Sequence, residues 1–139
     1  MLQIKAKSKS YLFGAYTHCA WPADDDIVAD PTGQSFIFSL VNVTNQAVRF
    51  SLKDKERAIE LSVRGLFFGG TKKDDSRQTG WPNFVMMFNG LAADQKGANM
   101  ANAVDADDAY QPDDGQLYDD AFLAGRSMFA AADIEVYQL

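Results

Sequence analysis

Hydrophobic and polar residues alternate, or hydrophobic residues gather in short dense runs, along much of this 139-residue chain. A period of two is typical of β-strands that bury one face. Residues 2–17 combine an alternating stretch, a Lys-Ser-Lys-Ser turn and a returning stretch from Tyr11, which predicts a β-hairpin. Residues 34–43, QSFIFSLVNV, form the densest run and predict a central strand.

Further strands are predicted over residues 47–52, 62–70, 83–90 and 133–139. In the closing strand we expect Ile134 and Val136 to face the core and Glu135 to face solvent. The chain's dense aromatic positions on strands are assigned to the core; they are Phe36, Phe38, Phe67, Phe68, Phe84 and Phe88.

The stretch KDKERAIEL, residues 53–61, predicts a helix of one or two turns, and residues 18–33 and 91–120 read as loops. No internal repeat or linker divides the chain, which indicates a single domain over residues 1–139. The fold class predicted is mainly β: a two-sheet antiparallel β-sandwich with a few short helices.

The net charge of −6 limits the kinds of partner that we expect the protein to bind. An acidic surface disfavours nucleic acid and anionic membranes, since both attract basic proteins. No apolar run approaches the roughly 20 residues that span a bilayer, so we expect no stable membrane insertion. The single cysteine, Cys19, allows no intrachain disulfide, which is typical of a cytoplasmic protein.

The sequence offers little for catalysis or for a cofactor. His18 is the only histidine, and its neighbour Cys19 would point to the opposite face of an extended chain, which disfavours a Cys-His dyad. One histidine and one cysteine are also too few for a structural zinc site. We therefore expect no metal, no cofactor and no enzymatic activity.

The acidic segment of residues 105–120 is the alternative candidate for chemistry. Asp105 and Asp107 begin like a calcium-binding EF-hand loop, but Ala109 and Tyr110 stand where the next ligand and the glycine belong. The acids that could still hold an ion are Asp105, Asp107, Asp108, Asp113 and Asp114. A calcium- or ligand-binding loop therefore stays open, as does an Asp-based hydrolase.

Four residues are candidates for contacts with a protein partner. Aromatic residues and arginine dominate binding hot spots, which selects Trp21, Trp81 and Arg126. Both tryptophans precede a proline and so favour extended loop conformations. Glu135 joins them as a solvent-facing charge on the closing strand.

Several stretches, in order, resemble the TLDc domain of the oxidation-resistance family. They are YLFGAYT with Trp21 shortly after, DPTGQSFIFSL, VRFSLKDKERAIEL, GLFFGG and the ending FLAGRSMFAAADIEVYQL. The resemblance covers residues 10–139. The family's usual domain begins earlier, so the chain resembles an N-terminally shortened form, and residues 91–120 are longer and more acidic than the family pattern.

The resemblance implies a two-sheet sandwich and a non-catalytic, cytoplasmic protein-interaction module. It also implies a link to protection from oxidative stress and to the vacuolar-type proton pump, the V-ATPase, whose subunits would be the partners. In the family pattern the last strand lies inside the sandwich, and Gly125 belongs to a turn that needs a positive φ.

Overall fold

The computed structural model describes residues 2–6, 11–21, 26–62, 65–69, 73–74, 77–78, 84–87, 98–99, 109–116, 118–119, 121–123, 125, 128–129 and 131–137. The described strands are β1 (Leu2–Ala6), β2 (Leu12–Tyr16), β3 (Asp26–Val28), β4 (Phe36–Val41), β5 (Val48–Leu52), β6 (Ile59–Ser62), β7 (Gly65–Phe68), β8 (Lys73–Asp74), β9 (Arg77–Gln78), β10 (Phe84–Met87), β11 (Ala98–Asn99), β12 (Tyr110–Pro112), β13 (Met128–Phe129) and β14 (Ala131–Val136).

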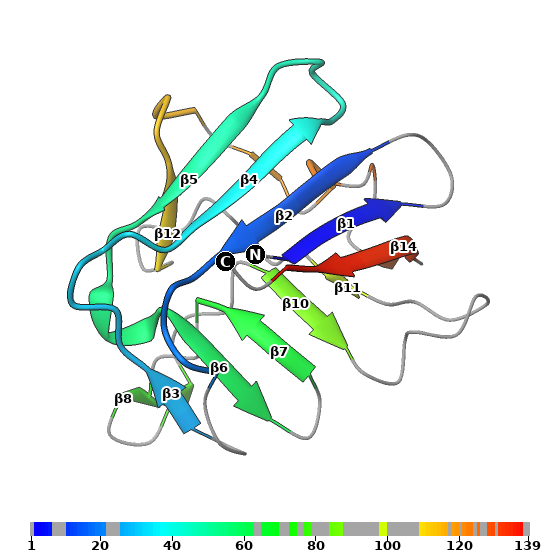
Figure 1. The fold of residues 1–139 in the computed structure, drawn as a ribbon. Helices are drawn as coiled ribbons and strands as arrows, with labels where there is room; N and C mark the ends of the chain where they lie inside the picture. Colours follow the sequence, from blue (N-terminus) through cyan, green and yellow to red (C-terminus); the bar gives the residue numbers. More distant parts are fainter. Residues whose placement is uncertain are drawn as a thin grey trace.

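Two antiparallel sheets make up the fold (Figure 1). Among the described residues, one sheet has the strand order β12-β5-β4-β2-β1-β14 and the other β13-β11-β10-β7-β6-β3, while β8 and β9 pair separately. The predicted mainly β, two-sheet antiparallel architecture is confirmed. The chain changes sheet between β2 and β3 and changes back between β3 and β4.

The hairpin predicted over residues 2–17 is confirmed, because β1 pairs with β2 from Leu2↔Ala15 to Lys5↔Leu12. On its other side β1 pairs with β14, from Leu2↔Val136 to Ala6↔Ala131. The first and last strands of the chain therefore lie side by side (Figure 1). The predicted closing strand forms, at one end of the six-strand order.

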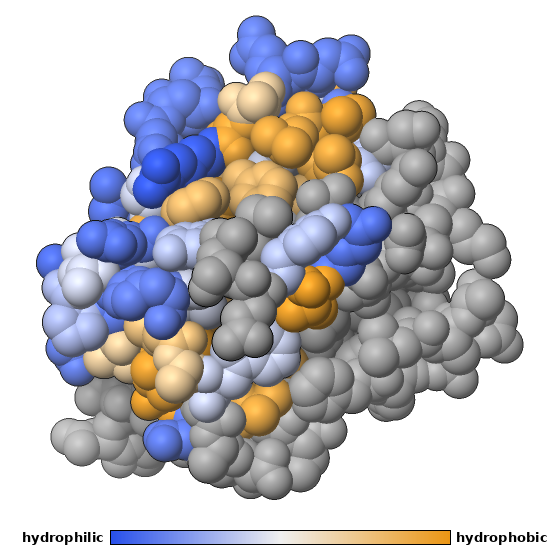
Figure 2. Space-filling model, viewed as in Figure 1, coloured by the Kyte–Doolittle hydropathy of each residue, from blue (hydrophilic) through white to orange (hydrophobic). Residues whose placement is uncertain are grey.

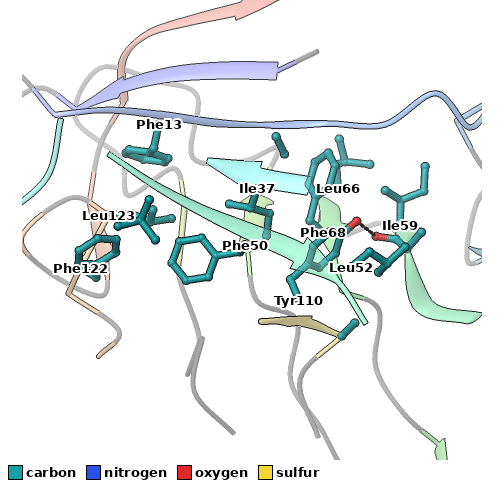
Figure 3. Packing of buried hydrophobic residues seen from close by; sticks show 14 of the residues in the cluster. Phe13, Ile37, Phe50, Leu52, Ile59, Leu66, Phe68, Tyr110, Phe122 and Leu123 are labelled. Atoms are coloured by element: carbon teal, nitrogen blue, oxygen red, sulfur yellow. Dashed lines mark hydrogen bonds between the residues drawn. The ribbon is translucent and has the colours of Figure 1, made fainter. Parts of the chain in front are cut away.

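Side chains from both sheets fill the space between them (Figure 3). Phe13, Ile37 and Phe50 come from the first sheet, and Leu66 and Phe68 come from the second, all at most 3% exposed. Strand β5 shows the alternation most clearly: Val48, Phe50 and Leu52 are buried and the residues between them are not. Burying one such side chain stabilises the fold by about 1.5–3 kcal/mol.

Several predictions of which side chains face the core are wrong, and Phe67, predicted to be in the core, is only half-buried. Val136 is 56% exposed rather than in the core, while Glu135 is exposed as expected. Phe36 and Phe38 are only half-buried, since the inward positions of β4 belong to Ile37 and Ser39. The dense apolar run of this six-residue strand thus places apolar side chains on both faces of the sheet.

The predicted helix is a single 3-10 turn, Lys55–Arg57. Asp54 caps it by accepting from the Glu56 amide at 3.2 Å and from the Arg57 Nε at 2.7 Å. Ala58 and Ile59 then become fully buried as the chain enters β6. Burial of these side chains between the sheets outweighed their helical spacing. Among the described residues, this turn is the only helical element, and no helix is long and apolar enough to span a membrane.

One buried hydrogen bond links the sheets directly. The Tyr110 hydroxyl, on β12 of the first sheet, donates to the Ala58 carbonyl beside β6 of the second at 2.8 Å (Figure 3). The Ala58 amide donates to Val28 and the Gly69 amide donates to Ala58, both at 3.1 Å, so Ala58 joins three segments. Burial raises the pKa of Tyr110 far above its ordinary range, which keeps the hydroxyl a neutral donor.

Replacing Tyr110 with Phe is expected to lower the free energy of unfolding by about 1–2 kcal/mol, because a buried hydrogen bond is lost while the ring stays packed. Tyr16→Phe is the matched control, as Tyr16 is half-buried on the outer face and should change by less than about 0.5 kcal/mol. Urea unfolding of both variants measures the difference. Equal effects would show that the Tyr110 hydroxyl does not link the sheets.

Gly125 has φ +75°, which confirms the predicted turn, and its amide donates to Ala121 at 2.7 Å. A Cβ there would lie 2.8 Å from the Tyr11 hydroxyl oxygen, whereas a Cβ on Gly115, at φ +68°, meets open space. Gly115→Ala should therefore cost about 1 kcal/mol from backbone strain alone. Gly125→Ala should cost about 1–3 kcal/mol more, by thermal or urea unfolding, because it also displaces Tyr11. Equal costs would contradict the close approach of Tyr11 to this turn.

Candidate functional site

The predicted site residues fall into two groups. Trp81, Arg126, Asp105, Asp107 and Asp108 lie outside the described residues. Of the others, Trp21 lies in the loop after β2, Glu135 lies on β14, and Asp113 and Asp114 follow β12. Within the described part of the chain these four residues occupy three separate elements, because Asp113 and Asp114 share one turn.

Trp21 and Glu135 are both at the surface. Trp21 is 49% exposed, so about half of its surface is accessible to solvent, and its contact role stays a prediction. Glu135 is opposite Gln3 in the pairing of β14 with β1, and its carboxylate accepts a hydrogen bond from the Tyr137 hydroxyl. Val136 beside it is exposed, so this end of β14 combines one acidic and one apolar side chain.

Asp113 and Asp114 take part in a local turn. Asp113 lies 3.8 Å from the Arg49 guanidinium, an exposed ion pair. Asp114 accepts from the Gln116 amide at 2.9 Å and from the Tyr118 hydroxyl at 2.5 Å. Burial, and then the hydrogen bond to Asp114 with its charge, raise the pKa of Tyr118 to about 12. These carboxylates thus serve the turn itself, and none of the described acids near them forms a group of three ligands.

An open hollow of about 520 Å³ separates this turn from the β4–β5 hairpin. The hairpin contributes Val43, Thr44 and Gln46, and the facing segment contributes Asp114, Tyr118 and Asp119. Phe122 forms part of the lining and is otherwise in the core, where its ring lies 4.0 Å from that of Tyr118. The hollow therefore has an apolar base and two carboxylates at its rim.

Exposed apolar side chains continue from this hollow along the hairpin. Leu40 is 50% exposed, Val41 39% and Val43 53%. Figure 2 shows hydrophobic residues gathered over the end of β4. We call Leu40, Val41 and Val43 the hairpin patch. Surface apolar side chains are common singly, but a group beside a hollow marks an interaction site more often.

A second cluster forms where the chain passes from β3 to β4. Asp30 there is fully buried, and its Oδ1 accepts from the Thr32 amide at 3.0 Å, the Thr32 hydroxyl at 2.6 Å and the Gly33 amide at 3.1 Å. Its Oδ2 accepts from the Ser35 amide at 2.8 Å. Burial acts to raise the pKa of Asp30, but the hydrogen bonds from Thr32, Ser35 and Gly33 outweigh it, so the pKa lies well below its usual range.

His18 and Cys19 approach this carboxylate. The His18 Nε2 lies 3.7 Å from Asp30 Oδ1, and one ligand atom from each of His18, Cys19 and Asp30 lies within 4.8 Å of the others. The prediction that His18 and Cys19 point to opposite faces is wrong, because the chain bends at Cys19 instead of extending. The Cys19 amide donates to Thr17 at 3.1 Å, and the thiol approaches the Ala29 carbonyl at 3.6 Å.

Sequence reasoning missed Asp30. The run Asp30-Pro31-Thr32-Gly33 is typical of a turn in which the Asp side chain binds following backbone amides, and this was the signal available. The carboxylate is buried only because the two sheets enclose the turn, and the local sequence pattern does not predict that burial. The cluster offers an imidazole, a thiol and a carboxylate at one place, a donor set suited to a transition metal.

Comparison with protein-family models gives one finding. The TLDc domain model matches residues 1–139, so the chain belongs to the TLDc family. This agrees with the predicted resemblance and with the two-sheet antiparallel architecture. Comparison with curated proteins and with solved structures gave no match. The family is generally non-catalytic.

Asp30→Asn should lower the free energy of unfolding by about 2–4 kcal/mol. The asparagine side chain carries no charge, and its NH₂ group would face the N–H donor of either Ser35 or Thr32. Since the folded pKa of Asp30 is depressed, its stabilisation is present above the unfolded value near 4 and is lost as the pH falls toward the folded pKa.

Asp113→Asn is the matched control for Asp30→Asn. Asp113 is exposed and forms only a surface ion pair with Arg49, so its loss should cost at most about 0.5 kcal/mol. Chemical denaturation at neutral pH compares the two. A small effect at Asp30 would refute the role of its carboxylate in ordering the crossover.

Proposed function

We propose that this TLDc domain is a non-catalytic protein-interaction module that binds a subunit of the vacuolar-type proton pump. In this proposal it acts in the cytoplasm, regulates the pump and contributes to protection from oxidative stress. Membership of the TLDc family supports this class of function. The observation that carries the proposal is the hairpin patch beside the open hollow. Its apolar side chains are exposed to solvent and so contribute little to the core.

The chemistry of this surface indicates what the partner segment would present. Leu40, Val41 and Val43 favour apolar side chains, which would lose contact with water on binding. Asp114 and Asp119 at the hollow favour a lysine or arginine beside them. The partner segment in this proposal is therefore apolar with a basic residue, in keeping with the net charge of −6 on the domain.

Capture of pump subunits from a cell lysate, quantified by mass spectrometry, tests the proposal. Val43→Ser should lower their capture about threefold to tenfold, equivalent to about 0.7–1.4 kcal/mol of binding free energy. Val136→Ser is the matched control, since Val43 is 53% and Val136 56% exposed and β14 lies at the far side of β2 and β1 from β4.

Two results would count against the proposal. If the folded parent domain enriches no pump subunit, the partner is wrong. If Val43→Ser and Val136→Ser lower capture equally, the hairpin patch is not the contact surface. Circular dichroism of each variant establishes that the sandwich has formed before capture is compared.

A further inference from the structure

The cluster of His18, Cys19 and Asp30 carries an inference independent of partner binding. Three different donor types, from the loop after β2 and the turn after β3, have ligand atoms within 4.8 Å of one another. Among the described residues this is the one group of three metal-ligating side chains that converges. His18 and Cys19 lie where the chain crosses from the first sheet to the second, and Asp30 lies where it crosses back. The fold therefore brings Asp30 to the two adjacent residues.

The carboxylate is held in place before any ion arrives. Asp30 accepts four hydrogen bonds from Thr32, Gly33 and Ser35, and its side chain is fully buried. Ligating carboxylates in metal sites are commonly fixed in this way by surrounding donors. The Cys19 backbone is held by its own bond to the Thr17 hydroxyl, which also accepts from the Ser35 hydroxyl at 3.0 Å.

The remaining donor gives the site an entrance. The His18 side chain is 37% exposed, so its imidazole can adjust by the distance that an ion requires. Ligand atoms around a tetrahedral zinc ion stand about 3.3–3.8 Å apart, given bonds of about 2.0–2.3 Å. The His18 to Asp30 separation of 3.7 Å already falls in that range, and the largest separation in the group exceeds it by about 1 Å.

The donor types select the metal. Calcium and magnesium prefer oxygen ligands alone, which a thiolate and an imidazole do not supply. Zinc accepts sulfur, nitrogen and oxygen together, and three protein ligands leave its fourth position to water. Cobalt(II) takes the same ligands and serves as a spectroscopic substitute.

We propose that His18, Cys19 and Asp30 form a mononuclear binding site for a divalent transition metal of the zinc type, with one coordination position open to solvent. Binding replaces the thiol proton of Cys19 with the metal ion and releases that proton to solvent. This proposal departs from the sequence expectation of no metal, because the fold brings the buried Asp30 carboxylate to His18 and Cys19 as a third ligand.

Titration of the reduced, purified chain with Co²⁺ and with Zn²⁺ tests this site. Because Cys19 is the only cysteine, a thiolate-to-cobalt absorption band can arise from no other residue. We expect this band to saturate at one ion per chain, and Zn²⁺ to displace Co²⁺ and to protect Cys19 from alkylation. No band at saturating Co²⁺, or one ion shared by two chains, would overturn the proposal.

Variants of the exposed His18 and the partly buried Cys19 identify the ligands, and circular dichroism establishes that each variant has folded. His18→Ala and Cys19→Ser should each weaken Zn²⁺ binding by at least about 100-fold, the upper end of what loss of an outer-shell group costs. Asp114→Asn is the control, because it removes a carboxylate from the acidic turn and should leave the affinity unchanged. If Asp114→Asn weakens binding and His18→Ala does not, the ion binds the acidic segment and the proposed site is wrong.

Discussion

The buried carboxylate of Asp30 is the interaction on which this structure most depends. The chain passes from one sheet to the other and back within the stretch between β2 and β4, so the crossover must be fixed for the two sheets to face each other. The Asp30 carboxylate fixes the crossover by accepting hydrogen bonds from the Thr32 amide and hydroxyl, the Gly33 amide and the Ser35 amide. The Asp30 backbone amide also donates to the Lys55 carbonyl at 2.8 Å. A buried charge is tolerable only when its lone pairs are satisfied in this way.

The polar interactions continue from Asp30 into the core. Ser35 is fully buried, and its hydroxyl donates to the Thr17 hydroxyl at 3.0 Å, while the buried Tyr110 hydroxyl donates to Ala58 beside the opposite sheet. Among the described residues, every buried side-chain polar atom has a hydrogen-bond partner. A satisfied network of this kind defines one arrangement of the sheets, whereas apolar packing alone tolerates several. The proposed metal site uses the end of this network that reaches the surface.

The two proposed functions rely on different parts of the fold. The hairpin patch and its hollow lie between β4, β5 and the segment after β12, and their side chains carry no part of the buried network. The His18 and Cys19 cluster lies at the crossover and depends on that network for its carboxylate. A change in one surface should therefore leave the other intact, which makes the two proposals separable by mutation.

Much of the sheet could be predicted from sequence, since alternation identified β1, β2, β5 and β14 and density identified β4. The sequence did not correctly predict which side chains of a strand face the core and which face solvent. Phe36 and Phe38 are apolar but outward, because the alternation of β4 turns Ile37 and Ser39 inward. The Phe36 ring is partly covered on the outer face, where the Arg49 guanidinium lies 4.2 Å from its centroid and the Tyr16 ring stacks on it at 5.2 Å. Strands β3 and β12 were hidden in segments rich in Asp and Pro, whose local preferences favour turns.

The site was harder to predict than the fold because it arises from tertiary approach. Asp30 and Cys19 are eleven positions apart and their side chains meet only when both sheets have formed, so neither spacing nor composition indicated them. The predicted contact residue Trp21 is exposed, yet nothing local distinguishes it from an ordinary surface tryptophan. Family resemblance supplied the proposed class of function, while the residues proposed to perform it could be identified only in the folded chain.

Native-state hydrogen exchange at the Ser35 amide tests the central role of Asp30 most directly. This amide donates to the buried Asp30 carboxylate, and the Gln116 amide donates to the exposed Asp114 carboxylate in a similar local bond. The account predicts that Ser35 exchanges only when the whole domain unfolds, at the rate of core amides such as that of Phe50, whereas Gln116 exchanges by local opening. If Ser35 exchanges as fast as Gln116, the carboxylate does not hold the crossover and the account is wrong.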